Sequence, residues 1–442
     1  MRSIHTLLSA HTIVTVDNNN TVLKNHSIAI DNGRIVDILP SDEATSLFNA
    51  NTHIEYDSHI LMPGLINAHT HAAMSLLRGI ASDLPLMEWL QNHIWPIEQK
   101  WVDENFVHDG SELAIAEMLR GGTTCFNDMY FFPEVTARVA STIGMRAVIG
   151  MIALEFPTAY ASSPDEYLSK GLALYDEYKT DPLIRNVFAP HAPYTVSNAT
   201  LTKINSYANE LDLPIHMHLH ETQAEIENSV KEFGQRPLSR LDELGLLNPN
   251  LLAVHMTQLD GNELDRVAQA GVTVIHCPES NLKLASGFCP THDLQQRQAK
   301  VIIGTDSCAS NDDLDMFSEM RTAALLAKGV SQQATAFSAQ QAIRATTIEA
   351  AAALGLDDEI GSLEKNKSAD IIAIGCDSIE GHPLFDVYGH LVYSTERSRV
   401  TDAFVGGRQL LRDRALTTIS EDEILKKTET WAEKIATTQP DR

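Results

Sequence analysis

The fold class that the sequence predicts is α/β: a (β/α)8 TIM-type barrel joined to a small β-sandwich domain that both chain termini form. Eight short apolar runs alternate with helix-like stretches between residues 63 and 361, and polar side chains close these runs. Further β-branched runs stand outside this region, at both ends of the chain. Strand and helix alternating over more than about 250 residues favour a closed parallel barrel over an open sheet.

The composition is that of a globular protein and excludes several functional classes. Of 442 residues, 43% are hydrophobic and 21% are charged, which argues against a disordered or fibrous chain. The formal net charge of -26 repels nucleic acids and anionic lipids, and no window approaches the ~18 apolar residues of a membrane span. The five cysteines form no Cys-x-x-Cys pair and indicate reduced thiols. We therefore expect a cytoplasmic protein that binds a small molecule, and neither nucleic acid nor membrane.

Residues 1–62 are expected to form the N-terminal part of the β domain. Short β-branched runs at 12–16, 27–30 and 34–38 are separated by breaks rich in Asn and Gly, which are typical of hairpin turns. This pattern predicts a small antiparallel sheet. It should end where Pro63 and Gly64 open the first barrel strand, since proline is tolerated at the start of a strand.

The barrel is expected to occupy residues 63–361. Its predicted strands are the runs at 61–71, 123–128, 145–152, 186–190, 213–219, 251–255, 272–276 and 301–306. Helical patterns lie between them, for example at 111–119, before a Gly-Gly pair, and at 198–209, where Ser197 is placed to cap the helix.

Residues 362–442 are expected to return to the β domain and to end in a helix. Strand-like runs occupy 369–374, 400–405 and 408–411, and a helical pattern runs from 421 to about 435. Because the ends of an inserted domain usually lie close together, we expect the strands from both chain ends to share one sheet.

Polar residues stand at the carboxyl ends of the barrel strands, which form the active face of such a barrel. Burying several of them together costs several kcal/mol unless they share an ion or hydrogen bonds. His69 and His71 lie two residues apart, so a strand points both rings to one side. Alone, such a pair is more often two strand-end histidines without a metal. With His218 and Asp306 closing other strands, three imidazoles and a carboxylate predict a zinc site.

The run 216–221 contains three histidines at alternate positions and ends in Glu221. Alternation puts the three rings on one face, but one ring near the strand end, His218, can reach the ion. His216 and His220 are therefore expected in the core or behind the ligands. Glu221 is expected to hang over the mouth of the barrel.

The motifs at 63–71, 218–221, 304–306 and 362–374 resemble the amidohydrolase superfamily. Within it, the chain is similar to the 5-methylthioadenosine/S-adenosylhomocysteine deaminases and to the related chlorohydrolases, over nearly its whole length. The resemblance implies one Zn²⁺ per subunit and a homo-oligomer, a dimer or tetramer. Binuclear members carry a carboxylated lysine at the end of strand four, but residues 187–191 contain no lysine, so one metal is expected.

The resemblance also implies roles for individual residues. The expected metal ligands are His69, His71, His218 and Asp306. The expected catalytic residues are Glu221 as the acid and base at the ring, and His255 and Asp306 beside the bound water. The expected substrate-binding residues are Glu98 at the sugar hydroxyls, His191 at the purine, Glu221, Trp89 and Ser310. For Trp89 and Ser310, ordinary loop packing explains the residue nearly as well.

The function that follows is zinc-dependent hydrolytic deamination of an adenosine-type nucleoside to its inosine analogue and ammonia. The loop at 150–160 has no arginine and one glutamate, Glu155, so its wall should be apolar and faintly acidic. This favours methylthioadenosine over S-adenosylhomocysteine, whose carboxylate needs a guanidinium partner. The alternatives are a triazine-type chlorohydrolase or aminohydrolase, a deaminase of another aminopurine such as guanine, and a metal-binding barrel without catalytic activity.

Overall fold

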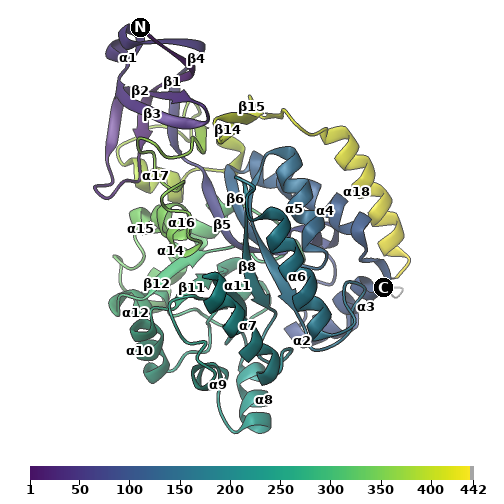
Figure 1. Ribbon diagram of the computed structural model, residues 1–442. Coiled ribbons are helices and arrows are strands. Elements are labelled where there is room, and N and C mark those ends of the chain that lie inside the picture. Colours follow the sequence, from purple (N-terminus) through teal and green to yellow (C-terminus); the bar gives the residue numbers. More distant parts are fainter. Residues whose placement is uncertain (439–442) are drawn as a thin grey trace.

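The computed structural model describes residues 1–438 and contains two sheets of eight strands each (Figure 1). One sheet is parallel and forms a barrel surrounded by helices. The other, at the top of Figure 1, combines strands from both ends of the chain. Within residues 1–438, no helix is both long and apolar enough to cross a membrane.

The parallel sheet confirms the predicted barrel. Its strands, in chain order, are β5 (Leu65–Thr70), β6 (Thr123–Asp128), β7 (Arg146–Ala153), β8 (Ile184–Pro190), β9 (Ile215–Leu219), β10 (Leu251–His255), β11 (Thr273–His276) and β12 (Lys300–Ile303). A parallel bridge between Thr70 and Asp306 joins the end of the ring to its beginning. There the backbone N–H groups of Thr305 and Asp306 donate to the carbonyl of His69, at 3.1 and 3.0 Å.

Most predicted boundaries of the barrel strands lie within two residues of the observed ones, and two differ by more. The last strand ends at Ile303 rather than at 306, because the backbone turns and Asp306 adopts a left-handed φ of 63°. Pro63 closes a strand of the terminal sheet instead of opening the first barrel strand, which begins at Leu65. Gly64 lies between them, where a Cβ atom would stand 2.0 Å from Thr124 Oγ1, so only glycine fits at this junction.

Helices cover the outside of the barrel. Ser197 caps α7 by accepting a hydrogen bond from the N–H of Thr200, as expected, and α4 begins earlier than expected, after its cap Asp103. The helices from the barrel strands onward are η1 (Ala72–Leu77), α2 (Leu86–Trp89), η2 (Leu90–Ile94), α3 (Trp95–Trp101), α4 (Glu104–Arg120), α5 (Pro133–Ile143), α6 (Pro164–Tyr178), α7 (Asn198–Leu211), α8 (Gln223–Phe233), α9 (Pro237–Glu243), α10 (Gly261–Ala270), α11 (Pro278–Lys283), α12 (Thr291–Gln296), α13 (Cys308–Asn311), α14 (Met316–Ser331), α15 (Ala339–Ala345), α16 (Ile348–Ala353), α17 (Val387–Tyr393), η3 (Arg397–Arg399) and α18 (Glu421–Ala436).

The terminal sheet confirms that both chain ends build one β domain. Its order is β16-β15-β14-β13-β4-β1-β2-β3, and β13 pairs antiparallel with β4. The strands are β1 (Arg2–Val14), β2 (Val22–Asp31), β3 (Arg34–Pro40), β4 (Phe48–Pro63), β13 (Ile371–Gly375), β14 (Val400–Val405), β15 (Arg408–Arg412) and β16 (Ala415–Leu416).

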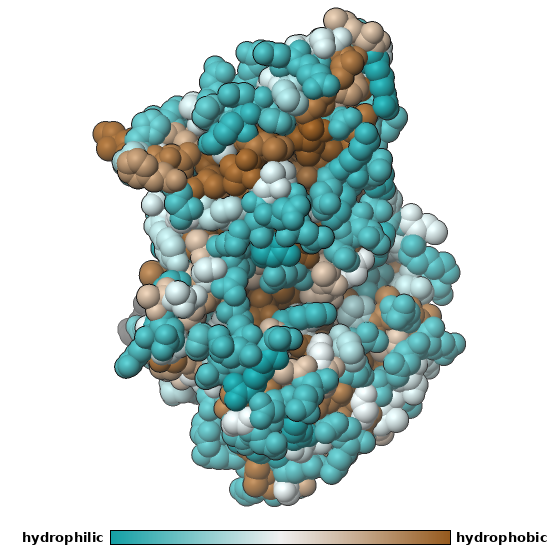
Figure 2. All heavy atoms as spheres, turned by 90° about the vertical axis from the view of Figure 1, so that its left-hand side faces the viewer, coloured by the Kyte–Doolittle hydropathy of each residue, from teal (hydrophilic) through white to brown (hydrophobic). Residues whose placement is uncertain are grey.

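The predicted N-terminal runs pair antiparallel, β1 with β2 and β2 with β3, but the sheet also contains a parallel pair that the sequence did not indicate. A short helix, α1 (Ser41–Leu47), carries the chain back so that β4 pairs parallel with β1. The first two thirds of β4 are largely exposed, so its sequence lacks the apolar alternation that marks a strand. On the face shown in Figure 2, hydrophobic side chains form a brown band across the upper part, where the terminal sheet lies.

Among the contacts between the terminal elements and the barrel are a buried salt bridge and a hydrogen bond from a tryptophan. Arg146, on β7, and Asp370, just before β13, form a buried salt bridge with an Nε to Oδ2 distance of 2.9 Å. The last helix, α18, lies along α4 on the right of Figure 1, and there Trp431 Nε1 donates to Asp109 Oδ2 at 2.9 Å. The terminal elements thus brace the barrel that carries the site. The domain limits at 62/63 and 361/362 stay a prediction.

Candidate active site

A cavity of about 690 Å³ opens at the carboxyl ends of the barrel strands. It brings together residues that are far apart in the sequence. The predicted site residues that line it are His71, Trp89, Glu98, His191, His218, Glu221, His255, Asp306 and Ser310.

Four donor groups converge beside this cavity: His69, His71, His218 and Asp306, each offering one atom within 4.8 Å of the others. His218 Nε2 lies 3.2 Å from His69 Nε2 and 3.3 Å from His71 Nε2. Asp306 Oδ1 lies 3.4 and 3.2 Å from the same two nitrogens. Ligands bonded at about 2.0–2.1 Å to a tetrahedral zinc stand about 3.3 Å from one another, so this group fits zinc.

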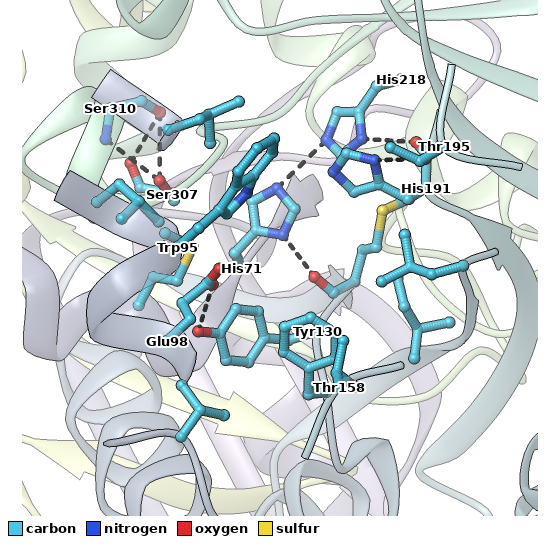
Figure 3. Close-up of a pocket in the computed structure, with 18 of the residues that line it drawn as sticks. His71, Trp95, Glu98, Tyr130, Thr158, His191, Thr195, His218, Ser307 and Ser310 are labelled. Atoms are coloured by element: carbon cyan, nitrogen blue, oxygen red, sulfur yellow. Dashed lines mark hydrogen bonds between the residues drawn. The ribbon is translucent and has the colours of Figure 1, made fainter. Parts of the chain in front are cut away.

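The second ring nitrogen of two of these histidines donates to a backbone carbonyl. His71 Nδ1 lies 2.5 Å from the carbonyl oxygen of Met129, and His218 Nδ1 lies 2.8 Å from that of His191 (Figure 3). Because a carbonyl can only accept, each Nδ1 carries the proton and each Nε2 presents a lone pair. This is the arrangement that metal-binding histidines require.

His216 lies behind the group and is not one of the four donors. Its Nε2 is 2.8 Å from His69 Nδ1, and its Nδ1 faces the side-chain amide of Asn127. Burial holds the pKa of His216 well below its usual range, so the ring is neutral. His220 is also apart from the group, and its Nε2 accepts the N–H of Leu238.

Asp306 divides its two oxygens between the histidines and two serines. While Oδ1 faces the rings, Oδ2 accepts hydrogen bonds from Ser280 at 2.6 Å and Ser310 at 3.0 Å. Burial alone would raise the pKa of Asp306, but the neighbouring imidazoles, those of His69 and His71 first, hold this pKa well below its usual range. Ser310 thus lines the cavity with its hydroxyl turned to Asp306, and its contact with substrate stays a prediction.

Glu221 and His255 form a second pair of ionisable side chains in the same cavity. Glu221 is 6% exposed, and its Oε2 lies 3.9 Å from His255 Nε2. Burial raises the pKa of Glu221. His255 Nδ1 lies 2.8 Å from Asn281 Oδ1, so the ring carries its proton on that side and keeps Nε2 free to accept one. A carboxyl group and an imidazole placed in this way can pass protons to and from a bound molecule.

Glu225 supports the turn that carries Glu221. Its two carboxylate oxygens accept the backbone N–H groups of His220 at 3.0 Å and Glu221 at 2.7 Å. Burial raises the pKa of Glu225 to about 8. The sequence signal for this role is the spacing, since a carboxylate at the third position of a helix can reach back to the turn that precedes the helix.

The wall formed by α2, η2 and α3 carries Glu98. The Glu98 carboxylate accepts a hydrogen bond from Tyr130 at 2.8 Å (Figure 3), and burial raises the pKa of Glu98 to about 7. Trp95, which also lines the cavity, and Tyr130 were not predicted from the sequence. Trp89 lines the cavity but is 4% exposed and donates to the Ile80 carbonyl, so the packing interpretation also holds for it.

His191 stands on another side of the cavity, after β8. Its Nδ1 lies 3.0 Å from Thr195 Oγ1, and burial lowers its pKa to about 3, so the ring is neutral. Figure 3 shows Glu98 and His191 on either side of His71. The cavity thus offers a carboxylate at one end and an imidazole at the other.

The loop after β7 forms an apolar part of the wall through Leu154 and Phe156. The expectation that Glu155 makes this wall acidic was wrong. Its Oε2 accepts the N–H of Ser197 at 3.0 Å and the hydroxyl of Thr200 at 3.1 Å, so the carboxylate points to the start of α7. Among the lining residues within 1–438 there is neither lysine nor arginine.

Comparison with known proteins agrees with this geometry. A model described as the amidohydrolase family matches residues 60–410. A curated relative from Saccharophagus degradans, named 5-methylthioadenosine/S-adenosylhomocysteine deaminase, is 48% identical over 429 residues, which are 97% of this chain and 96% of the relative.

Two solved structures show how far the similarity extends. The crystal structure of an adenosine deaminase from Xanthomonas campestris with bound zinc has a TM-score of 0.97 and 48% identity, covering 99% of each chain. An atrazine chlorohydrolase from Arthrobacter aurescens in complex with zinc has a TM-score of 0.90, covers 97% of this chain and 100% of its own, and is 22% identical. The second similarity shows a shared fold and nothing finer.

Proposed function

The chain belongs to the amidohydrolase family, and from this premise we propose that it is a zinc-dependent hydrolytic deaminase of adenosine-type nucleosides. The products are the inosine analogue and ammonia. The observation that carries the proposal is the placement of Glu221 and His255 in the same cavity as a group of four zinc-type donors. The names of the relatives, which are deaminases of such nucleosides, support it.

The proposed metal site consists of His69, His71, His218 and Asp306 and holds a single Zn²⁺. Three imidazoles and one carboxylate are donors that zinc prefers, and their spacing fits its tetrahedral geometry. When bound, the ion supplies Lewis-acid chemistry and lowers the pKa of a water molecule toward about 7.

The residues of the chain supply the proton transfers. His255 Nε2 and Asp306 accept the proton that the attacking water loses. Glu221 gives a proton to the ring nitrogen beside the amino-bearing carbon, because its raised pKa keeps it protonated closer to neutral pH than an exposed glutamate. As the tetrahedral carbon collapses, a proton passes to the amino group and ammonia leaves. Each such transfer contributes on the order of 10² to 10⁴ in rate.

The cavity suits a purine nucleoside in size and polarity. Its volume of about 690 Å³ lies in the usual range for small-molecule sites. In this proposal the Glu98 carboxylate accepts hydrogen bonds from the sugar hydroxyls, and His191 contacts the purine. The apolar wall of Leu154 and Phe156 favours the methylthio group of methylthioadenosine over the charged amino-acid tail of S-adenosylhomocysteine.

Ammonia release by the purified zinc-loaded protein tests the function. The substrates are adenosine, methylthioadenosine, S-adenosylhomocysteine, guanine and an alkylamino chlorotriazine. We expect ammonia from the adenosine-type nucleosides and little from the other two compounds. Turnover of the triazine, measured as released chloride or alkylamine, or ammonia release from guanine alone, would replace the proposed substrate class. Absence of turnover on every compound would favour a metal-binding barrel without catalytic activity.

We also propose that the protein is a cytoplasmic homo-oligomer, a dimer or tetramer. The hydrophobic band in Figure 2 and the exposed side chains of Ile379 and Phe385, which are 91% and 94% exposed, support self-association. All five cysteines are free and buried, which supports a reducing compartment. Light scattering on the purified protein gives the oligomeric state, and a monomer at micromolar concentration would contradict this part.

A further inference from the structure

We infer that Tyr130 is a positioning residue for the sugar of the substrate: its hydroxyl holds one oxygen of Glu98, so that the other oxygen is presented to the sugar diol. The inference rests on the proposed function and names a residue that the sequence did not point to. Tyr130 acts through Glu98 and need not touch the reacting atoms.

The contact joins two parts of the chain that meet only in the folded barrel. Glu98 belongs to α3, whereas Tyr130 follows the end of β6 and is 4% exposed. Tyr130 Oη donates to Glu98 Oε1 at 2.8 Å, as the dashed line in Figure 3 shows. Among residues 1–438, no other group donates a hydrogen bond to the Glu98 carboxylate. Its Oε2 therefore keeps its lone pairs for a ligand.

The surroundings explain why a hydroxyl is needed at this place. The described lining of the cavity contains no lysine or arginine that would balance the Glu98 carboxylate. Burial favours the neutral acid, and the hydrogen bond from the hydroxyl of Tyr130 opposes this effect of burial. A protonated carboxyl group accepts fewer hydrogen bonds and binds a diol less well than a carboxylate does. The Tyr130 hydroxyl therefore stabilises the ionised form of Glu98 and fixes the orientation of its carboxylate.

Tyr130 also relates the sugar site to the metal site. The residue before it, Met129, accepts a hydrogen bond from His71 Nδ1 and donates its N–H to the Thr70 carbonyl at 3.0 Å. The same turn of chain thus orients a proposed metal ligand and, one residue later, the Glu98 carboxylate. This linkage holds the sugar and the reacting ring at a defined separation, and a displacement of about 1 Å at such a site can cost 10²-fold in rate.

The test compares adenosine with 2′,3′-dideoxyadenosine, which lacks the diol, in Tyr130→Phe. We expect kcat/KM for adenosine to fall about tenfold, mainly through KM, because a charge-assisted hydrogen bond network is lost. For the dideoxy compound we expect a change of less than about twofold, and an unchanged zinc content. Tyr388→Phe is the matched control, since Tyr388 Oη donates to the Asn20 carbonyl at 3.2 Å, far from the cavity. Loss of this hydroxyl should leave kcat/KM unchanged for both substrates.

A double mutant separates a positioning role from a merely structural one. In the Glu98→Ala background, Tyr130→Phe should have no further effect on adenosine, because the group it positions is gone. Equal losses on both substrates, or a tenfold loss that persists without Glu98, would overturn the inference. If the unmodified protein deaminates neither nucleoside, the proposed function fails. If it deaminates both, and Tyr130→Phe has the same kcat/KM for adenosine as the unmodified protein, only this inference fails.

Discussion

His69 Nδ1 lies 2.8 Å from His216 Nε2, so a histidine outside the donor group sets the orientation of one inside it. With His216 as the acceptor, His69 carries its proton on Nδ1 and presents Nε2 to the shared point. Partners of this kind contribute to affinity although they never touch the ion.

The first prediction concerns this partner. His216→Phe should weaken zinc binding about 10- to 100-fold while leaving the protein folded, because the ring volume is kept and the acceptor is lost. Titration with a competing chelator measures the affinity. His220→Phe is the control, since His220 is equally buried but contacts Leu238 and Gln258 instead of a donor. Equal zinc affinity in His216→Phe and the unmodified protein would show that the contact does not support the site.

Removing a donor should be more severe than removing its partner. His218→Ala takes away one of four atoms that share a point, so zinc content and turnover should both be lost. Metal analysis by mass spectrometry after dialysis, together with an ammonia assay, checks both. A full equivalent of zinc with normal activity in this variant would remove His218 from the ligand set.

Glu221→Gln should keep the metal and lose most activity. Glutamine preserves the shape and the hydrogen bonding of the side chain but cannot deliver a proton to the ring nitrogen, so kcat should fall by on the order of 10² to 10⁴. Glu227→Gln, on the exposed face of α8, controls for the loss of one negative charge. If kcat of Glu221→Gln stays within a few-fold of the original, another group is the acid.

The pH dependence of KM should follow Glu98. Burial raises its pKa to about 7, so the carboxylate becomes protonated as the pH falls through 7. The ionised form is the better acceptor for the sugar diol, hence KM for adenosine should rise below pH 7 and level off above about pH 8. The KM for 2′,3′-dideoxyadenosine should lack this rise. A parallel rise for both compounds would assign the titration to a different group.

The last prediction is a substrate preference. We expect methylthioadenosine to exceed S-adenosylhomocysteine about ten- to hundredfold in kcat/KM, since the described lining has no cation for the carboxylate of the latter. Both constants should come from one preparation. Introducing an arginine by Phe156→Arg, at a half-exposed position of the lining, should narrow the difference. Parity between the two thioethers in the unmodified protein would contradict the prediction.

The barrel and the donor group could be predicted from the sequence because each depends on local patterns. Strand alternation places His69 and His71 on one side, and the position of His218 and Asp306 at or just beyond strand ends places them on the same face. The structure brings these four together. A polar, largely exposed strand such as β4 has no such pattern, since its place is decided by the neighbours it pairs with.

The supporting residues could not be predicted for the same reason. Ser280 and Asn281 follow β11 in a short helix, and Tyr130 follows β6 in a loop. Their partners Asp306, His255 and Glu98 stand 25 or more positions away in the chain. No spacing rule along a helix or strand connects residues at such separations, so these contacts become visible only when the barrel is closed.

The pairing of β4 with β13 has a consequence for how the chain folds during synthesis. β4 ends at Pro63 and β13 begins at Ile371, so at about 5–20 residues per second the partner strand emerges roughly 15 to 60 s after β4. During that interval one edge of β4 has no neighbour and can pair with strands of other nascent chains. We expect the newly made N-terminal strands to depend on chaperone protection until the barrel and its last strands have been translated.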